Sequence, residues 1–264
     1  MNYISAYCTD PGSIRRVNQD SLCIKSASAG DNEYILAAVC DGLGGLTDGE
    51  TASAYIITEL SGWFERALPL LLGEGRTVLQ IRHSLDEFLH GAAGRINRYA
   101  EKTGRLPGTT MTLMLSLGCF GKIITAHVGD TRLYTVGESE TELITSDHSV
   151  LFDEIRNGTL TEEEAANDSR QNQLTRCIGA GLDNIVFDYS ILPARTDVTY
   201  LICSDGFRKK ISRDEISEEL RPGLITDDDT AEQKLRKLTD LCMERRENDN
   251  ITAVAVKQKE KDGI

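Results

Sequence analysis

The chain has 264 residues, of which 40% are hydrophobic, and its formal net charge is -13. This length is near the upper end of what one hydrophobic core holds, so we expect a single catalytic-type domain over residues 1–264. The acidic balance, without any long basic run, argues against nucleic acid or an anionic membrane as a partner. It would also repel a phosphorylated substrate unless bound cations reversed the charge locally.

Seven cysteines are scattered along the chain without a Cys-x-x-Cys pair, mostly among apolar neighbours. We interpret them as reduced core residues, which argues against a disulfide scaffold and a thiolate zinc site. No apolar stretch approaches the ~18 residues typical of a transmembrane helix. Residues 1–10 lack the basic and apolar segments of a signal peptide. The expectation is therefore a cytoplasmic enzyme.

The first part of the chain predicts strands followed by helices. Short apolar or alternating runs, separated by turn residues, predict three strands. They are residues 3–9, 21–26 and 34–40. Apolar residues at helical spacing then predict helices over about 49–72 and 78–102, each with an apolar stripe that should face a sheet.

Strand patterns return after residue 108. The predicted strands are residues 110–119, 122–128, 132–136, 185–192, 198–203 and 251–256. A helix is predicted over about 230–246. Residues 146–180 have few apolar positions, so we expect short helices in an excursion beside the sheet. Because strands and helices come in blocks, the pattern favours an α+β fold with antiparallel sheets and outer helices.

Four aspartates stand at the borders of apolar runs, each within two residues of a glycine or asparagine: Asp20, Asp41, Asp205 and Asp249. Their positions would let the carboxylates converge on one edge of a sheet. Converging carboxylates raise each other's pKa, a cost that a hard divalent ion removes. Mg²⁺ and Mn²⁺ suit such oxygen ligands, and two ions can activate water for attack on phosphorus. The pattern therefore predicts metal-assisted hydrolysis of phosphoesters.

Each of these motifs has a simpler explanation when taken alone. Asp41-Gly42 and Asp205-Gly206 are typical of hairpin turns, and Asp249-Asn250 is typical of a cap or Asx turn. An arginine such as Arg15 is most often a solvated surface residue. Only the combination of the motifs favours a functional site.

A series of short motifs runs through nearly the whole chain in a fixed order. They are Arg15-Arg16-Val17-Asn18-Gln19-Asp20-Ser21, Asp41-Gly42-Leu43-Gly44-Gly45, Gly49-Glu50-Thr51-Ala52-Ser53, Gly108-Thr109-Thr110, His127-Val128-Gly129-Asp130-Thr131-Arg132, Asp147-His148-Ser149, Leu174-Thr175-Arg176, Ile178-Gly179, Ser204-Asp205-Gly206 and Asp249-Asn250-Ile251-Thr252. In this order the motifs resemble the metal-dependent serine/threonine phosphatases of the protein phosphatase 2C family, especially its compact bacterial members.

The resemblance implies an αββα sandwich of two antiparallel sheets flanked by helices, with two Mn²⁺ or Mg²⁺ ions at one end between the sheets. By the same resemblance, Asp41 would bridge the two ions and the Gly42 carbonyl would bind one of them. Asp205 and Asp249 would hold the other, and Asp20 would act through metal-bound water. A metal-activated water would then hydrolyse phosphoserine or phosphothreonine without a covalent intermediate.

The resemblance also gives roles to two further residues. Arg15 would clamp the substrate phosphate, which suits a bidentate guanidinium, and Asp130 would contribute to a possible third metal site. Two positions depart from the family pattern. Leu46 stands where a histidine is common, which leaves protonation of the leaving group unassigned. Lys209 stands where an acidic residue usually supports the third ion, which argues against a well-occupied third site.

The leading hypothesis is a protein phosphatase whose substrates are proteins phosphorylated by a serine/threonine kinase. One alternative is a pseudophosphatase that serves as a regulatory binding module, motivated by Leu46 and Lys209. Another is a phosphohydrolase of small phosphoesters, which the same metal chemistry would serve. Residues 146–180 correspond to the variable flap region of the family, and we expect them to influence substrate choice.

Overall fold

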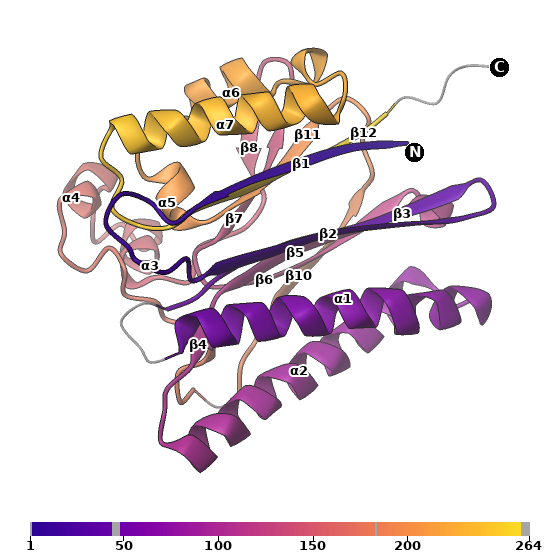
Figure 1. Cartoon of the computed structure of the whole chain (residues 1–264), viewed down its shortest axis with the longest axis horizontal. Helices are drawn as coiled ribbons and strands as arrows, with labels where there is room; N and C mark the ends of the chain where they lie inside the picture. The colour runs from indigo at the N-terminus through magenta and orange to yellow at the C-terminus, as the bar shows by residue number, and fades with distance from the viewer. Residues whose placement is uncertain (1, 44–47, 183, 260–264) are drawn as a thin grey trace.

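Two antiparallel sheets of five strands each lie face to face, and helices cover the outer face of each sheet (Figure 1). The computed structural model describes residues 2–43, 48–182 and 184–259. The four layers form an αββα sandwich, so the predicted α+β fold class is confirmed.

The first sheet has the strand order β1-β12-β11-β7-β8. Its strands are β1 (Tyr3–Asp10), β12 (Ile251–Gln258), β11 (Thr199–Cys203), β7 (Arg132–Val136) and β8 (Thr141–Leu143). Two helices, α6 (Arg213–Leu220) and α7 (Asp228–Glu244), pack on its outer face (Figure 1). Leu235 and Leu238 of α7 and Ile216 of α6 are buried there against the sheet.

The second sheet has the strand order β10-β6-β5-β3-β2. Its strands are β10 (Asp188–Pro193), β6 (Lys122–Val128), β5 (Met111–Leu117), β3 (Asn32–Asp41) and β2 (Asp20–Ala29). The long helices α1 (Gly49–Gly73) and α2 (Val78–Thr103) cover its outer face. The remaining short elements are the strand pair β4 (Gly108–Thr109) and β9 (Ile178–Gly179), the helices α3 (Val150–Arg156), α4 (Glu162–Ala166) and α5 (Asp205–Arg208), and the 3-10 turns η1 (Gly118–Phe120) and η2 (Pro222–Leu224).

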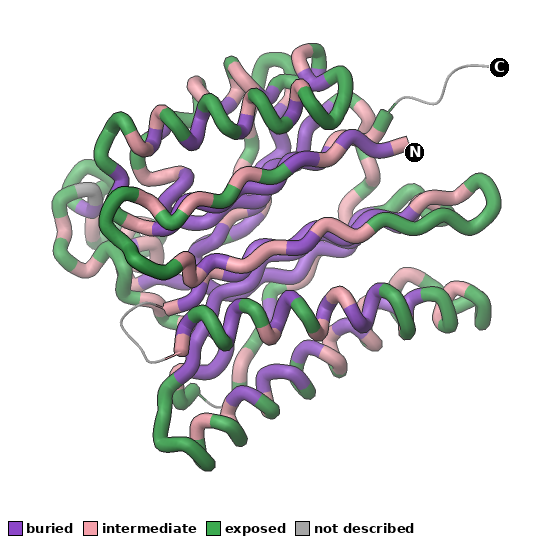
Figure 2. The backbone as a smooth tube through the Cα atoms, in the orientation of Figure 1, coloured by how far each residue is buried: buried purple, intermediate pink, exposed green. Residues whose placement is uncertain are grey.

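Strand β3 is almost entirely apolar, and the structure shows why. Leu36 and Ala38 face α1 and α2, whereas Ile35, Ala37 and Val39 face the other sheet. Alternate residues of a strand point to opposite faces, so a strand covered on both sides needs apolar residues throughout. Figure 2 shows this burial along the strands of both sheets. Each fully buried leucine, isoleucine or valine side chain contributes roughly 1.5 to 3 kcal/mol, and each alanine contributes less.

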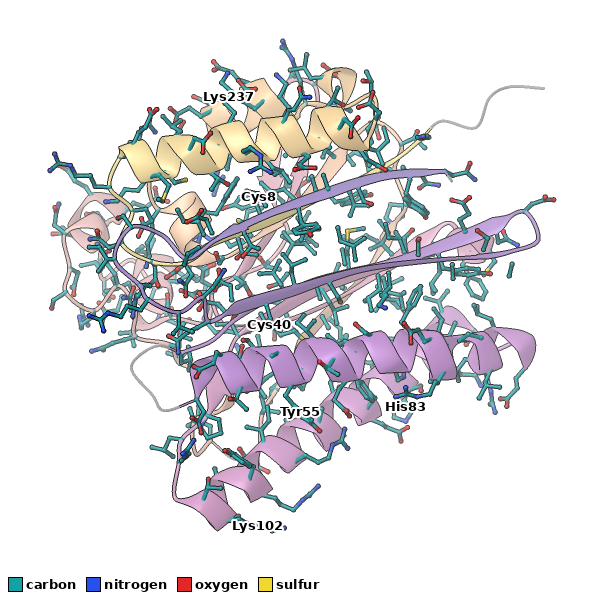
Figure 3. The ribbon with its side chains drawn as sticks, viewed as in Figure 1. Cys8, Cys40, Tyr55, His83, Lys102 and Lys237 are labelled. Atoms are coloured by element: carbon teal, nitrogen blue, oxygen red, sulfur yellow. The ribbon has the colours of Figure 1, made fainter. Side chains whose placement is uncertain are left out.

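The cysteines follow the prediction only in part. All seven cysteines are free thiols and five are buried, but Cys119 is exposed and Cys8 is half-buried, so the prediction of core positions was wrong for these two. Cys40 belongs to the buried cluster between the second sheet and its helices, and His83 lies on α2 (Figure 3). Within the described ranges, the structure contains no helix with the length and apolar character needed to span a membrane.

The sequence predicted the long elements well and several short ones poorly. Helix α6, strand β8 and the single-turn helix α5 were not predicted, and β10 begins at Asp188 rather than at residue 185. The start of α6 carries a capping box, in which Ser212 and Glu215 satisfy each other's backbone N–H groups. This Ser-x-x-Glu pattern was a usable signal for a helix start.

Candidate active site

The predicted acidic residues all lie at one end of the sandwich, near α5 in Figure 1. Asp20 opens β2 and Asp41 closes β3, and the two are direct partners in the antiparallel register. Asp205 follows β11 as the first residue of α5, and Asp249 lies just before β12. Asp130 stands in the turn between β6 and β7. The structure thus brings together residues that are far apart in the sequence.

Burial and mutual repulsion act on these carboxylates together. Burial raises the pKa of Asp20 to about 7, the nearby hydroxyls of Thr252 and Ser204 oppose this rise, and the charges of Asp205 and Asp249 add to it. Burial also raises the pKa of Asp41 well above its usual range, with repulsion from the other acids as a further cause. The pKa of Asp130 is raised to about 7, again mainly by burial and then by Asp205. These groups therefore form one electrostatic cluster that favours bound protons or bound cations.

Several carboxylate oxygens of this cluster are buried without a hydrogen-bond partner in the described part of the chain. They are both oxygens of Asp20 and Oδ1 of Asp205. Buried polar atoms are normally satisfied, so orphaned oxygens of this kind need an explanation. Hard divalent cations such as Mg²⁺ and Mn²⁺ take oxygen ligands of this type. The donor set therefore fits the predicted kind of metal.

The acids do not enclose a ready-made ion site in the conformation described. Among the residues that the structure describes, no three His, Cys, Asp or Glu side chains are gathered closely enough to hold an ion. Two of the acids are instead engaged by basic side chains. Lys209 Nζ lies 2.5 Å from Asp205 Oδ2, and Arg15 Nε lies 3.2 Å from Asp249 Oδ1.

The backbone around Asp41 is fixed by the strand pair that starts at residue 108. The Asp41 N–H donates to the Thr110 hydroxyl oxygen at 3.0 Å, and Thr109 donates its hydroxyl to the Asp41 carbonyl at 2.9 Å. The next residue, Gly42, has no space for a side chain. A Cβ at this position would lie 2.5 Å from the Gly49 carbonyl oxygen and 2.6 Å from that of Gln19. Close packing therefore requires glycine at 42.

Asn250 joins the two halves of the cluster, and the sequence analysis gave it no role. Its side-chain amide donates to the carbonyls of Pro11 at 2.9 Å and Val17 at 3.2 Å, and its Oδ1 accepts from the Gln19 N–H at 2.9 Å. A side chain at Gly206 would overlap the Asn250 carbonyl, so α5 packs directly on this turn. Asn250 thereby positions the loop that carries Arg15. Its place beside Asp249 in a quoted motif was the available signal.

Arg15 is close to the acids but remains accessible. Its guanidinium contacts both oxygens of Asp249, at 3.2 Å in each case, and its side chain is 39% exposed. An ion pair this open to water contributes little to stability. The guanidinium can therefore reorient toward an incoming anion at little cost, and its planar donors suit a phosphate group.

Asp130 borders a second charged cluster that the sequence analysis did not predict. Arg132 binds both oxygens of Asp147, at 2.8 and 2.7 Å. Arg208 donates to the same carboxylate at 3.1 Å and lies 3.7 Å from Asp130 Oδ2. Although burial alone would raise it, these two arginines lower the pKa of Asp147. Asp130 therefore faces protein cations on one side and the other acids on the other.

The segment 146–180 contains the expected short helices. Ser149 caps α3, and Thr161 forms a capping box with Glu164 at the start of α4. After α4, Asn172 accepts a hydrogen bond of 2.9 Å from Lys209. The flap segment is thus attached to the acid cluster through Lys209. Leu46, the other departure from the family pattern, lies outside the described residues.

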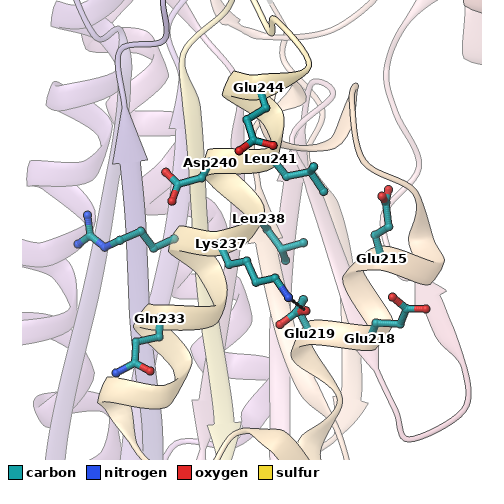
Figure 4. Close-up of a pocket in the computed structure, with 10 residues that line it drawn as sticks. Glu215, Glu218, Glu219, Gln233, Lys237, Leu238, Asp240, Leu241 and Glu244 are labelled. Atoms are coloured by element: carbon teal, nitrogen blue, oxygen red, sulfur yellow. Dashed lines mark hydrogen bonds and ion pairs between the residues drawn. The ribbon is translucent and has the colours of Figure 1, made fainter.

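A hollow elsewhere on the surface is lined by α6 and α7, with Glu219, Lys237 and Glu244 among its residues (Figure 4). Glu219 forms ion pairs with Lys234 and Lys237 across this groove. The predicted site residues are absent from its described lining. Acidic residues outnumber basic ones in this lining, and the hollow lies apart from the acid cluster, so we do not assign it a role in the chemistry.

The fold is an αββα sandwich, and its acid cluster contains carboxylate oxygens without a hydrogen-bond partner among the described residues. These features make the chain a candidate metal-dependent phosphohydrolase. The model of one family, "Protein phosphatase 2C", matches residues 15–242. Serine/threonine phosphatase stp of Listeria monocytogenes is 30% identical over 213 residues, which cover 81% of each chain. Protein phosphatase PhpP of Streptococcus pneumoniae is 29% identical over 256 residues, covering 96% of this chain and 97% of that protein.

A similar solved structure is the catalytic domain of the serine threonine protein phosphatase PstP in complex with 2 manganese ions. The two chains are 24% identical, the TM-score is 0.78, and the match covers 98% of this chain and 99% of that one. This similarity shows that the two chains share the same fold.

The chain belongs to the protein phosphatase 2C family. The predicted family and the predicted class of enzyme, a protein serine/threonine phosphatase, are therefore confirmed.

Proposed function

We propose that this protein serine/threonine phosphatase depends on two divalent ions, Mn²⁺ or Mg²⁺. Asp41, the Gly42 carbonyl, Asp205 and Asp249 would hold them, and Asp20 would act through water. The observation that carries this proposal is the set of buried, orphaned carboxylate oxygens on Asp20 and Asp205. Four acids gathered at one site, two of them buried, are costly without cations, and bound ions remove that cost. The manganese found in PstP supports the same choice of metal.

Bound ions of this type supply a water of lowered pKa as the nucleophile, so the chain needs no nucleophilic side chain of its own. Arg15 orients the phosphate with its guanidinium donors and stabilises the charge that develops on the phosphoryl oxygens. Asn250 keeps the Arg15 loop in place through the Pro11 and Val17 carbonyls. Asp130 lies near Arg208 and adds negative charge to the cluster. If a third ion binds, Asp130 would contribute to its site.

The substrates we propose are phosphoproteins, with a serine/threonine kinase as the source of the phosphate and the cytoplasm as the place of action. The whole chain would act as one catalytic domain. The segment 146–180 would influence substrate choice, because it is linked to the acid cluster through Asn172 and Lys209. Exchanging this segment with that of a relative should change the preference among phosphopeptides. Unchanged preference would count against this part of the proposal.

Phosphate release from a phosphothreonine peptide tests the main proposal. The assay compares Mn²⁺ with EDTA, and wild type with Asp41→Asn, using Asp197→Asn as a matched control at an exposed acid outside the cluster. Release should require both the metal and Asp41, and the control should behave as wild type. A free phosphorylated metabolite tested alongside distinguishes small phosphoesters from proteins. Equal release with EDTA would contradict the metal dependence.

A regulatory binding module without turnover is the second candidate. The observation that favours it is the ion pair of Lys209 with Asp205, which engages one of the proposed metal ligands. If folded, Mn²⁺-loaded wild type releases no phosphate, whereas Lys209→Asp does, this second candidate replaces the first.

A further inference from the structure

Lys209 is the residue that connects the acid cluster with the flap segment. Its Nζ lies 2.5 Å from Asp205 Oδ2 and 2.9 Å from Asn172 Oδ1. The Lys209 side chain is 20% exposed and that of Asp205 is 8% exposed, so both are largely shielded from water. Lys209 follows Asp205 by one helical turn, which places the two side chains on the same face of α5.

The ammonium group of Lys209 forms an ion pair with Asp205. Asp205 is left with an uneven environment. One oxygen binds the ammonium, whereas Oδ1 is buried without a partner in the described part of the chain. The same carboxylate can therefore accept a second cation.

We infer that Lys209 is a positioning residue that weakens divalent-ion binding at Asp205 and ties the flap segment to the acid cluster. This inference rests on the proposed function for its metal-binding half. The ammonium already neutralises Asp205, and a divalent ion bound there must tolerate or displace a positive charge. Any movement of Lys209 also alters its hydrogen bond to Asn172. Ion binding and flap position are thus coupled through one side chain.

Three variants separate the two roles of Lys209. Lys209→Met removes the charge and the hydrogen bonds, Lys209→Arg keeps a positive charge, and Asn172→Ala removes only the flap contact. Mn²⁺ binding to EDTA-treated, dialysed protein is measured by calorimetry. Hydrogen exchange of residues 168–177 is measured without metal. Circular dichroism confirms that each variant is folded, and Lys209→Gln replaces Lys209→Met if that variant is not.

Removing the charge should tighten Mn²⁺ binding by on the order of tenfold. Lys209→Arg and Asn172→Ala should each stay within about twofold of wild type. Exchange in the flap should rise in both Lys209→Met and Asn172→Ala. A residue with a merely structural role would not tighten ion binding when removed. Unchanged or weaker Mn²⁺ binding by Lys209→Met would overturn the inference, as would unchanged flap exchange.

The failure of this inference can be told apart from failure of the proposed function. If neither wild type nor Lys209→Met binds Mn²⁺, the proposed function and the metal-binding half of the inference both fall. Exchange in the metal-free protein then decides the flap half alone. If wild type binds Mn²⁺ and Lys209→Met binds it no better, the proposed function stands and the inference falls.

Discussion

Two groups of buried acids lie side by side at the same end of the sandwich, and the protein treats them in opposite ways. Asp147 is surrounded by Arg132 and Arg208, and its pKa is lowered. Asp20 has no hydrogen-bond partner for either oxygen among the described residues, and its pKa is raised to about 7. A buried acid with its own arginines supports the structure, whereas a buried acid without a partner suggests a site for an external cation.

The largest stability effect should come from removing the charge of Asp147, the buried acid that Arg132 and Arg208 neutralise. Asp147→Asn leaves the largely buried Arg132 guanidinium without its carboxylate, and leaves Arg208 with only its longer contact to Asp130. Removing one partner of a buried ion pair costs about 3 to 5 kcal/mol. Urea unfolding should show this loss with and without Mn²⁺. A loss below about 1 kcal/mol would mean that the arginine cluster is no more important than a surface pair.

Removing the charge of Asp20, which has no such partner among the described residues, should instead raise the free energy of unfolding. The folded-state pKa of Asp20, about 7, lies above the usual value of 3.8 for an aspartate, so the folded protein binds more protons between these values. The stability that this group contributes is therefore complete below about pH 4 and is lost as the pH rises through 7. In EDTA, the unfolding free energy of Asp20→Asn should exceed that of wild type by up to about 4 kcal/mol at pH 8. Near pH 4 the two values should be equal.

The comparison with wild type is necessary because His127 acts in the same pH range with the opposite sign. Burial lowers the pKa of His127 to about 4, so its contribution to stability falls as the pH drops below about 6.5. This effect is present in both proteins and cancels in the difference. An Asp20→Asn variant that is less stable than wild type at pH 8 would show that the Asp20 carboxylate is not a destabilising group.

A bound ion should supply the compensation that Asp20 and its neighbours lack. With free Mn²⁺ at about one hundred times its Kd, the unfolding free energy of wild type should rise by about 2.7 kcal/mol. Asp41→Asn should lose most of this increase, and Asp147→Asn should keep it. Thermal denaturation across a Mn²⁺ titration provides the measurement. Equal stabilisation of the wild type and Asp41→Asn would place the ion elsewhere.

The smallest effect should come from an exposed ion pair, which tests whether burial is the deciding factor. Arg195 and Asp197 form a salt bridge of 2.7 Å, but their side chains are 44% and 67% exposed. Asp197→Asn should change the unfolding free energy by less than about 1 kcal/mol, and this effect should shrink further in high salt. A loss as large as that of Asp147→Asn would remove the distinction drawn between the two buried groups.

The sequence was sufficient to predict which acids come together. Asp20, Asp41, Asp205 and Asp249 each border a strand, and strand borders were visible as changes from apolar to turn residues. In an antiparallel sandwich such borders meet at the two ends, which limits the possible partners of each residue. The family motifs then selected one end. The layer order and the covering helices followed from the same blocks of strands and helices.

The partners of the basic residues could not be predicted in this way. The contact of Lys209 with Asp205 depends on α5, which is only one turn long and leaves no periodic pattern in the sequence. The contact of Lys209 with Asn172 joins segments 37 positions apart through an irregular region. Arg132, Asp147 and Arg208 come from three different elements, and their charges alone do not show which acid each arginine meets.

The β2–β3 hairpin makes the spacing between Asp20 and Asp41 tolerant of some changes in length and intolerant of others. The two residues are paired at the open end, and the register runs without interruption to Ala29 and Asn32 at the turn. Extending both arms by matched residues at that turn would lengthen the hairpin and leave the acids opposite each other. Deleting one residue within a single arm would turn that arm's side chains to the other face of the sheet. Evolution can therefore lengthen this hairpin freely only at its far tip.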